Sequence, residues 1–260
     1  MRQFEPSSDC FGLVKNPCGE DFANACIKII GEEREKRGIG TLSERTLHSV
    51  LKNYFEPDET RQEVPIGGFV ADIVNENGIV EIQTGSFDAM RKKLSFVLEA
   101  AKVTMVYPIA EVKRLYWVDT ENGAVSGGKK SPKRGKIEDA FLELYKIKSF
   151  LKHENLNFCF VLLDLQEYRL LSGWSKDKKK GSRRKDRTPL AILGEVYVEN
   201  LSDYKQFLPL SLPEEFTVKD YKTAAKVSPK TAGVALNVLL EVGAVKRVGK
   251  KGNAFIYERA

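Results

Sequence analysis

The order of apolar patterns along the chain predicts an α/β fold built on a mixed central sheet. Residues 63–93 hold two runs rich in β-branched side chains, separated by an Asn-Gly turn signal and followed by an amphipathic helix. Two further apolar runs, 103–109 and 157–165, have the length and composition of strands, and a helical pattern at 137–151 lies between them. This order of helix, hairpin, helix, strand, helix and strand is typical of an α/β sandwich.

Composition and charge indicate a globular protein with a polyanionic partner. The chain of 260 residues is 42% hydrophobic, which suits one large domain or two. No apolar stretch reaches about 18 residues, and the N-terminus lacks the apolar region of a signal peptide, so we expect a cytoplasmic protein without a membrane partner. The net charge is +6, and residues 175–187 alone carry eight basic and two acidic side chains. This excess favours nucleic acid as the partner.

Cysteine and histidine content exclude several kinds of site. Cys10, Cys18 and Cys26 are spaced by eight residues, which matches no zinc-ligand spacing, so we expect reduced thiols. The two histidines, His48 and His153, are too few for metal sites built from several histidines. A serine hydrolase triad would need one of them, and no Gly-x-Ser-x-Gly motif accompanies them.

The hairpin carries polar residues inside apolar runs. Asp72, Glu81 and Gln83 interrupt the two strands. A two-residue loop at 77–78 puts Asp72 opposite Gln83, and a four-residue loop at 75–78 puts Asp72 opposite Glu81. In both registers the three side chains share one face, and directly opposed residues are about 5 Å apart at Cβ. Burying two carboxylates is costly unless something compensates, and a divalent cation is the simplest compensation.

Two alternatives to a metal site remain open. Asp72 could lie in solvent at a strand end, with Glu81 paired to Arg91 or a lysine. Asp58, after Pro57, is a second candidate for the first acid, although Glu-Pro-Asp-Glu is typical of a turn.

The segment around the hairpin resembles the PD-(D/E)XK nuclease superfamily. Asp72, Glu81, Gln83 and a helix opening at Ser86 follow its pattern of an acid late in one strand and (D/E)-x-K on the next, and the resemblance covers about residues 41–200. It implies a restriction-endonuclease-like sandwich. It also implies that Asp72 and Glu81 hold Mg²⁺ (or Mn²⁺) with a strand carbonyl such as that of Ile82. The chain departs from the pattern at Ala71, where proline is usual, and at Gln83, where lysine is usual.

Other residues could complete such a site. Lys92 or Lys93, from the helix after the hairpin, could replace the missing lysine, while Gln83 would orient the attacking water. Members of the superfamily often take a further acid from the helix before the hairpin, which makes Glu44 the first candidate and Glu56 the second. A surface Glu44 beside a surface His48 is an equally good interpretation.

The C-terminal residues resemble a bacterial winged helix-turn-helix. A short helix, a turn, a second helix at 229–242 and two strands joined by a basic turn follow a Pro-rich linker at 209–213. By analogy, Lys230, Thr231 and Asn237 would face the major groove, and Lys250 and Lys251 would contact phosphates. A winged helix used for protein contacts is the alternative.

Three regions follow from these patterns: a helical extension at 1–40, a nuclease-like domain at 41–208 and a winged-helix domain at 209–260. The basic run at 175–187 is expected to be a loop that orders on nucleic acid. Its candidate phosphate contacts are Lys178, Lys179, Lys180, Arg183, Arg184 and Lys185.

The sequence therefore predicts a metal-dependent phosphodiester hydrolase, endonuclease-like, whose substrate is nucleic acid, with double-stranded DNA favoured and RNA left open. The rival hypothesis is a catalytically inactive nuclease-like protein that serves as a winged-helix DNA-binding regulator. A homodimer is compatible with both. The absence of the usual lysine at Gln83 is the feature that sustains the rival hypothesis.

Overall fold

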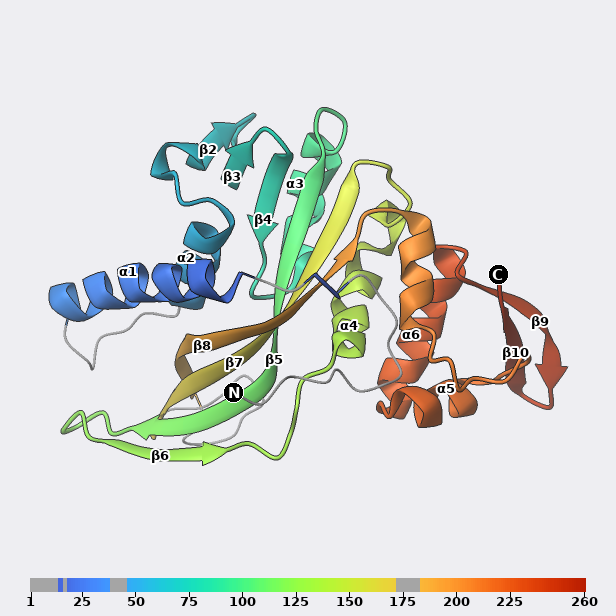
Figure 1. Ribbon diagram of the computed structural model, residues 1–260. Coiled ribbons are helices and arrows are strands. Elements are labelled where there is room, and N and C mark those ends of the chain that lie inside the picture. Colours follow the sequence, from blue (N-terminus) through green and yellow to red (C-terminus); the bar gives the residue numbers. More distant parts are fainter. Residues whose placement is uncertain (1–13, 16–17, 38–45, 172–182) are drawn as a thin grey trace.

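A mixed β-sheet forms the centre of the molecule (Figure 1). The computed structural model describes residues 14–15, 18–37, 46–171 and 183–260. The strands of the sheet are β1 (Val14–Lys15), β2 (Gln62–Ile66), β3 (Phe69–Asn75), β4 (Gly78–Ile82), β5 (Val103–Val118), β6 (Val125–Lys130), β7 (Leu156–Leu170) and β8 (Arg183–Val198). Their order across the sheet is β1-β8-β7-β5-β4-β3-β2, and β6 pairs with the far end of β5.

Parallel strand pairs lie in the middle of the sheet, and antiparallel pairs lie on either side of them. β4, β5 and β7 run parallel to one another, whereas β2, β3 and β4 form an antiparallel meander and β8 returns antiparallel to β7. Buried, largely β-branched and aromatic side chains fill the central strands, as expected for strands covered on both faces. The predicted α/β architecture with a mixed central sheet is thus confirmed at this level.

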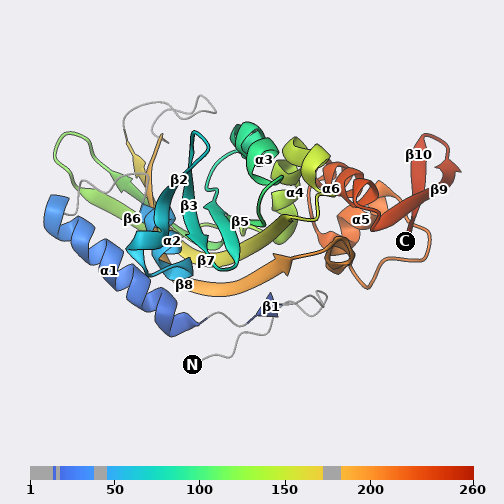
Figure 2. The same ribbon diagram turned by 90° about the horizontal axis from the view of Figure 1, so that it is seen from above.

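Helices cover the two faces of the sheet, as Figure 2 shows. On one face, α1 (Gly19–Arg37) and α2 (Thr46–Phe55) pack Phe22, Leu47 and Val50 against the sheet. On the other, a 3₁₀ turn (Phe87–Met90) leads into α3 (Arg91–Val97), and α4 (Phe141–Leu144) lies between two further 3₁₀ turns, Ile137–Ala140 and Tyr145–Phe150. Of the described helices, none is long and apolar enough to cross a membrane.

The long strands β5, β7 and β8 extend past the end of β4, which differs from prediction in two ways. The run 103–109, expected as a short strand, is the first part of the single long strand β5, which continues to Val118. Residues 183–187, expected in a loop, form the start of β8, where Arg183 pairs with Leu170 and Arg187 with Glu167. The backbone of β7 needs a hydrogen-bonded neighbour there, and the basic segment supplies it.

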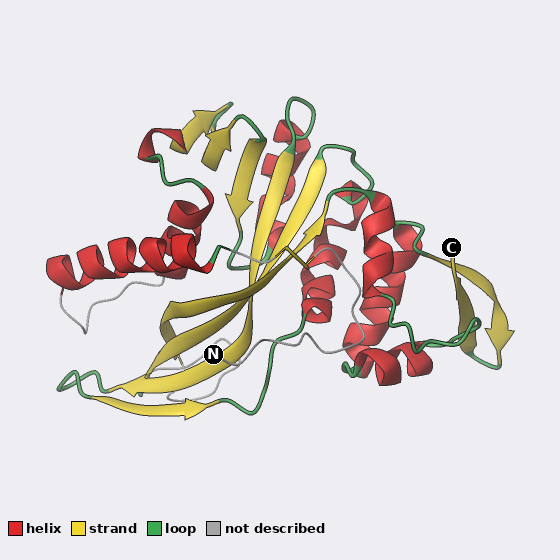
Figure 3. Cartoon of the chain, in the orientation of Figure 1, coloured by secondary structure: helices red, strands yellow, loops and turns green. Residues whose placement is uncertain are grey.

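The C-terminal module consists of α5 (Val218–Ala225), α6 (Pro229–Glu241), β9 (Val245–Lys251) and β10 (Ala254–Arg259), as coloured by element type in Figure 3. Its helix-turn-helix and two-stranded sheet match the predicted order of elements. Its apolar side chains, Leu236 and Leu239 among them, belong to the same cluster as Phe141, Leu144 and Ile147. The module is therefore packed on the sheet domain.

The predicted linker at 209–213 is anchored at both ends. Leu212 is buried, and Arg259 Nη2 donates to the carbonyl oxygen of Pro209 over 2.7 Å. Tyr221 Oη in α5 donates to the carbonyl oxygen of Phe207 over 3.1 Å. These contacts fix the path from β8 into the C-terminal module.

Candidate functional site

The register of the β3–β4 hairpin places two carboxylates side by side. Ile73 pairs with Val80 and Val74 with Ile79, so the next position sets Asp72 opposite Glu81. Of the two registers that the sequence allows, this is the one expected for the four-residue loop, although the pairing extends one step further, to Asn75 and Gly78. Two acids therefore face each other where the strands lie over the hydrophobic core.

The two strands separate at Asp72, and its side chain fills the gap. The backbone N–H of Ile82 donates to Asp72 Oδ2 over 2.8 Å, a hydrogen bond from the next strand to a side chain rather than to the backbone. His48 Nε2, from α2, lies 3.2 Å from the same oxygen. Asp72 is thus held from both β4 and α2 through one carboxylate oxygen, Oδ2.

Glu81 lies deeper and is paired with a lysine from α3. Glu81 is 3% exposed, and Lys93 Nζ lies 2.5 Å from Glu81 Oε1. The same ammonium group donates to the carbonyl oxygen of Val70 over 2.6 Å. Lys93 therefore binds both strands of the hairpin at the level of the two acids, which is the position that the sequence hypothesis required of a substitute lysine.

The surroundings move the pKa values of the two acids in opposite directions. Burial acts to raise the pKa of Asp72, but the hydrogen bond and charge of His48, the N–H of Ile82 and the charge of Lys93 together hold it below its usual value. Burial raises the pKa of Glu81, Lys93 offsets this only in part, and the negative charge of Asp72 adds to the rise. A cation between the carboxylates would relieve that repulsion.

A metal ion at this position would have few protein ligands. In the ranges that the structure describes, there is no group of three or more His, Cys, Asp or Glu side chains able to hold a metal ion. The two carboxylates and the Ile82 carbonyl stay the candidate ligands that the sequence named. Mg²⁺ is commonly held by one or two carboxylates together with substrate phosphate and water, so two carboxylates do not exclude it.

Gln83 and Lys92 occupy less central positions. Gln83 follows the last residue of β4, and its Oε1 accepts the N–H of Gly85 over 3.1 Å, so the side chain helps to shape the turn into α3. Lys92 is exposed, whereas Lys93 points towards Glu81. Between the two lysines offered by the sequence, the structure brings only Lys93 to the acids.

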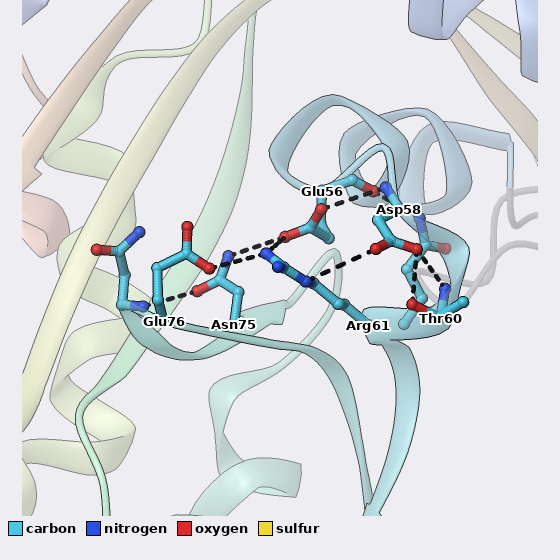
Figure 4. A network of polar contacts seen from close by, with 8 residues as sticks. Glu56, Asp58, Thr60, Arg61, Asn75 and Glu76 are labelled. Atoms are coloured by element: carbon cyan, nitrogen blue, oxygen red, sulfur yellow. Dashed lines mark hydrogen bonds and ion pairs between the residues drawn. The ribbon is translucent and has the colours of Figure 1, made fainter.

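Of the two further acids predicted before the hairpin, one is outside the described residues and the other lies away from Asp72 and Glu81. Glu44 lies outside the described residues. Glu56 is buried in a separate polar network, where it accepts from Asn75 Nδ2 and from the backbone N–H of Asp58, each over 3.2 Å (Figure 4). That network, completed by Arg61, holds the turn end of the hairpin and leaves Glu56 committed to structure.

Two partners of the site were missed by sequence reasoning. His48 contacts Asp72, and Lys52, one helical turn later, lies 2.5 Å from Glu63 Oε1 on β2. Glu63 is the strand neighbour of Asp72, since Gln62 pairs with Ile73 and Val64 with Ala71 on either side. The sequence does show that His48 and Lys52 share one face of a helix, because residues four apart on a helix lie on the same side. It does not show that this face points towards the hairpin.

Basic residues of β8 lie beside the end of β4. Arg187 Nη2 donates to the carbonyl oxygen of Thr84 over 3.2 Å, which brings the first part of β8 next to the residues that follow Glu81. Arg183 and Arg184 are exposed, and Lys185 is half-buried. Lys178, Lys179 and Lys180 lie outside the described residues.

The predicted recognition helix buries one of its three candidate residues. Thr231 is 3% exposed, and its N–H donates to Ser228 Oγ over 3.0 Å at the start of α6. Asn237 is half-buried, and its Oδ1 accepts from Lys148 Nζ over 3.4 Å. The expectation that Thr231 faces a major groove is therefore wrong for this packing, because α6 lies against the α4 region. Lys230, Lys250 and Lys251 are exposed.

Comparison with known proteins gives the family. A model described as "Domain of unknown function (DUF8091)" matches residues 45–199, more than half of the 260 residues. The chain belongs to the DUF8091 family. An uncharacterized protein of Treponema pallidum (strain Nichols) is 30% identical over 224 residues, which cover 85% of this chain and 87% of that protein. No solved structure matches the chain.

The DUF8091 match contains every residue of the acid cluster. It runs from just before α2 to the end of β8 and so includes His48, Asp72, Glu81 and Lys93. The C-terminal module begins after the matched residues. The candidate site thus lies within the matched residues.

Proposed function

We propose that this DUF8091 domain hydrolyses phosphodiester bonds in nucleic acid with the help of a divalent cation. The observation that carries the proposal is the convergence of Asp72, Glu81 and Lys93 at one point, from two strands and the helix that follows them. The arrangement is that of the PD-(D/E)XK nuclease pattern, with the lysine supplied by α3 in place of Gln83. The restriction-endonuclease-like fold and the winged-helix nature of the C-terminal module are parts of the same proposal.

Each residue of the cluster has a role that its contacts support. Asp72, kept ionised by His48 and the N–H of Ile82, and Glu81 would hold Mg²⁺ or Mn²⁺ together with the Ile82 carbonyl. The bound cation would supply Lewis-acid stabilisation of phosphate charge and a lower pKa for the attacking water. Lys93 would place its ammonium group beside the phosphate, where negative charge develops during attack.

The surrounding charge suits a phosphate polymer. Arg183, Arg184 and Arg187 lie on β8. The Arg187 guanidinium reaches the carbonyl oxygen of Thr84, two residues after the end of β4. Across the molecule, the turn between β9 and β10 exposes Lys250 and Lys251. Cations at both places would contact the backbone of a bound nucleic acid without reading its sequence.

The decisive experiment is cleavage of a plasmid and of a structured RNA in Mg²⁺ and in Mn²⁺. Wild type is compared with Asp72→Asn, Glu81→Gln and a matched control, Glu76→Gln, whose carboxylate lies 70% exposed at the other end of the hairpin. We expect cleavage by wild type and by the control, and a loss of about a hundredfold or more in the two site variants. The cleaved polymer identifies the substrate.

The opposite result has a definite meaning. If none of the four proteins cleaves while all bind plasmid with equal affinity, hydrolysis is ruled out. The inactive, DNA-binding regulator then becomes the better proposal, with Lys93 a structural partner that neutralises buried Glu81.

A further inference from the structure

An exposed apolar surface lies next to the candidate site. It consists of Phe69 and Phe96 and is called the apolar ledge below. Phe96 is 47% exposed, Phe69 is half-buried, and their rings are 5.9 Å apart at their centroids. The two rings therefore form one partly exposed aromatic surface where β3 meets α3.

The turn between β2 and β3 is shaped to seat the Phe96 ring. Gly67 has a φ of +51°, and a Cβ built on it would lie 2.1 Å from Cζ of Phe96. Any other residue at this position would displace the ring. The hairpin and α3 are therefore fitted to each other, and the ledge is a defined surface rather than a chance exposure.

Lys93 connects the ledge to the acids. Its ammonium group contacts Glu81 Oε1 at 2.5 Å and the carbonyl oxygen of Val70 at 2.6 Å. Phe96 follows Lys93 by three residues and so lies on the same side of α3.

We infer that the apolar ledge binds an unpaired nucleobase of the substrate next to the phosphate held by Asp72, Glu81 and Lys93. This inference rests on the proposed function and specifies its substrate class. A phosphate at the site carries a nucleoside on either side, and Phe96 follows the site lysine, Lys93, by three residues on α3. Aromatic rings bind bases through their faces, and those faces are available in single strands, loops and frayed ends but are covered in a stacked duplex. Exposed Lys92, on α3, flanks the ledge with positive charge.

The test measures binding without divalent metal, so that cleavage does not intervene. Fluorescence anisotropy compares a duplex with the same duplex containing a central unpaired stretch. The proteins are wild type, Phe96→Ala, Phe96→Trp and the control Leu201→Ala, which removes a side chain that is 42% exposed outside the ledge. Circular dichroism confirms that each variant is folded.

We expect wild type to bind the unpaired substrate about five- to a hundredfold more tightly than the duplex, the range for stacking of one base. Phe96→Ala should lose that preference, while Phe96→Trp and Leu201→Ala keep it. Equal binding of both substrates by wild type, or an unchanged preference in Phe96→Ala, would overturn the inference. A third contrary result would come from sedimentation. If Phe96→Ala binds both substrates as wild type does but has a lower oligomeric state, the ledge binds a second copy of the chain and the inference is overturned.

Failure of this inference is separable from failure of the proposed function. Plasmid cleavage that depends on Asp72 but is accompanied by no Phe96-dependent preference refutes the ledge and leaves hydrolysis standing. A Phe96-dependent preference in a protein that cleaves nothing supports the ledge and refutes hydrolysis.

Discussion

At the scale of single residues, helix phase decides which of two adjacent lysines can act at the site. Lys93 contacts Glu81 and Val70, whereas Lys92 is exposed one position earlier. Consecutive residues on a helix point about 100° apart, so only one of them can face the hairpin. The pair therefore offers a natural contrast between a site lysine and a surface lysine.

Lys93→Ala should lower the single-turnover rate of plasmid cleavage by about a hundredfold, because the phosphate loses a charge placed where negative charge develops. Lys92→Ala should stay within about twofold of wild type, since an exposed side chain contributes little to a positioned charge. The two rates are measured at saturating metal and DNA. Equal effects of the two substitutions would contradict the assignment of Lys93.

A second residue-scale prediction concerns Asp186, which is fully buried on β8. Burial raises its pKa from 3.8 to about 6, although hydrogen bonds from Thr46 and the N–H of Arg187 work against the rise. The folded chain thus holds this proton more tightly than the unfolded chain does. The protonated Asp186 carboxyl group therefore makes its full contribution to the free energy of unfolding below about pH 4, and this contribution is lost as the pH rises through about 6.

Asp186→Asn should remove this pH dependence, because an amide is neutral throughout and can still accept from Thr46. At pH 7.5 the variant should be more stable than wild type by up to about 3 kcal/mol, and the difference should vanish near pH 4. Urea unfolding at several pH values measures it. Asp88→Asn, which changes an exposed acid, serves as the control. A variant less stable than wild type at pH 7.5 would show that the ionised carboxylate is favourable there.

At the scale of elements, the β3–β4 hairpin sets the geometry of the site through one glycine. Gly78 has a φ of +112°, and a Cβ on it would lie 2.5 Å from the carbonyl oxygen of Lys102. The N–H of Ile79 donates to the same carbonyl over 2.8 Å, which starts the parallel pairing of β4 with β5. Gly78 thus fixes both the turn and the register that brings Asp72 to Glu81.

Gly78→Ala should destabilise the protein by about 2–4 kcal/mol, because both the backbone conformation and the close carbonyl oppose a side chain. Gly31→Ala is the matched control, since Gly31 lies in α1 with no atom within 4 Å of an added Cβ. It should stabilise by about 0.5–1 kcal/mol through helix propensity. Thermal unfolding distinguishes the two, and a neutral Gly78→Ala would contradict the register argument.

The packing of α6 against the α4 region limits which of its residues could contact DNA in the proposed function. Its apolar residues contact the α4 region, and Glu241 at its end lies 3.4 Å from Lys148 Nζ and 3.3 Å from Lys152 Nζ. Lys136 Nζ also donates to the carbonyl oxygens of Ala225 and Lys226, over 3.1 and 3.0 Å. A helix held in this way presents Lys230 to solvent, buries Thr231 and leaves Asn237 half-buried beside Lys148.

At the scale of the whole molecule, the C-terminal module and the sheet domain share one hydrophobic cluster. The exposed turn between β9 and β10 is therefore carried at a fixed position relative to the acids. Arg247 and Lys250 lie 4.1 and 4.7 Å from the ring of Phe255, which gathers positive charge on this turn. In the function proposed above, this packing leaves the β9–β10 hairpin exposed to contact phosphates.

The double variant Lys250→Ala, Lys251→Ala should weaken plasmid binding and reduce the slope of log K against log salt by about two, one for each lost phosphate contact. Asn237→Ala should leave both affinity and slope unchanged, because its side chain is engaged with Lys148. Binding is measured across a salt series in the absence of divalent metal. A large effect of Asn237→Ala alone would indicate that α6 leaves its packed position to bind DNA.

The sequence by itself determined the local features of this protein. Alternation of apolar side chains and an Asn-Gly turn predicted the hairpin, and the period of two placed Asp72 and Glu81 on one face in either register. Capping signals predicted α5 and α6, where Ser228 Oγ accepts the N–H of Thr231 as a helix cap. These features depend on neighbours in the chain, so the chain alone specifies them.

Only the tertiary structure decided which surfaces meet. It chose the register that opposes Asp72 to Glu81, brought His48 and Lys93 to them from the two faces of the sheet, and turned α6 against the α4 region. The basic segment 183–187 became a strand because β7 required a partner. Contacts between distant residues depend on how whole elements bury their apolar faces, and periodicity identifies such a face without naming what covers it.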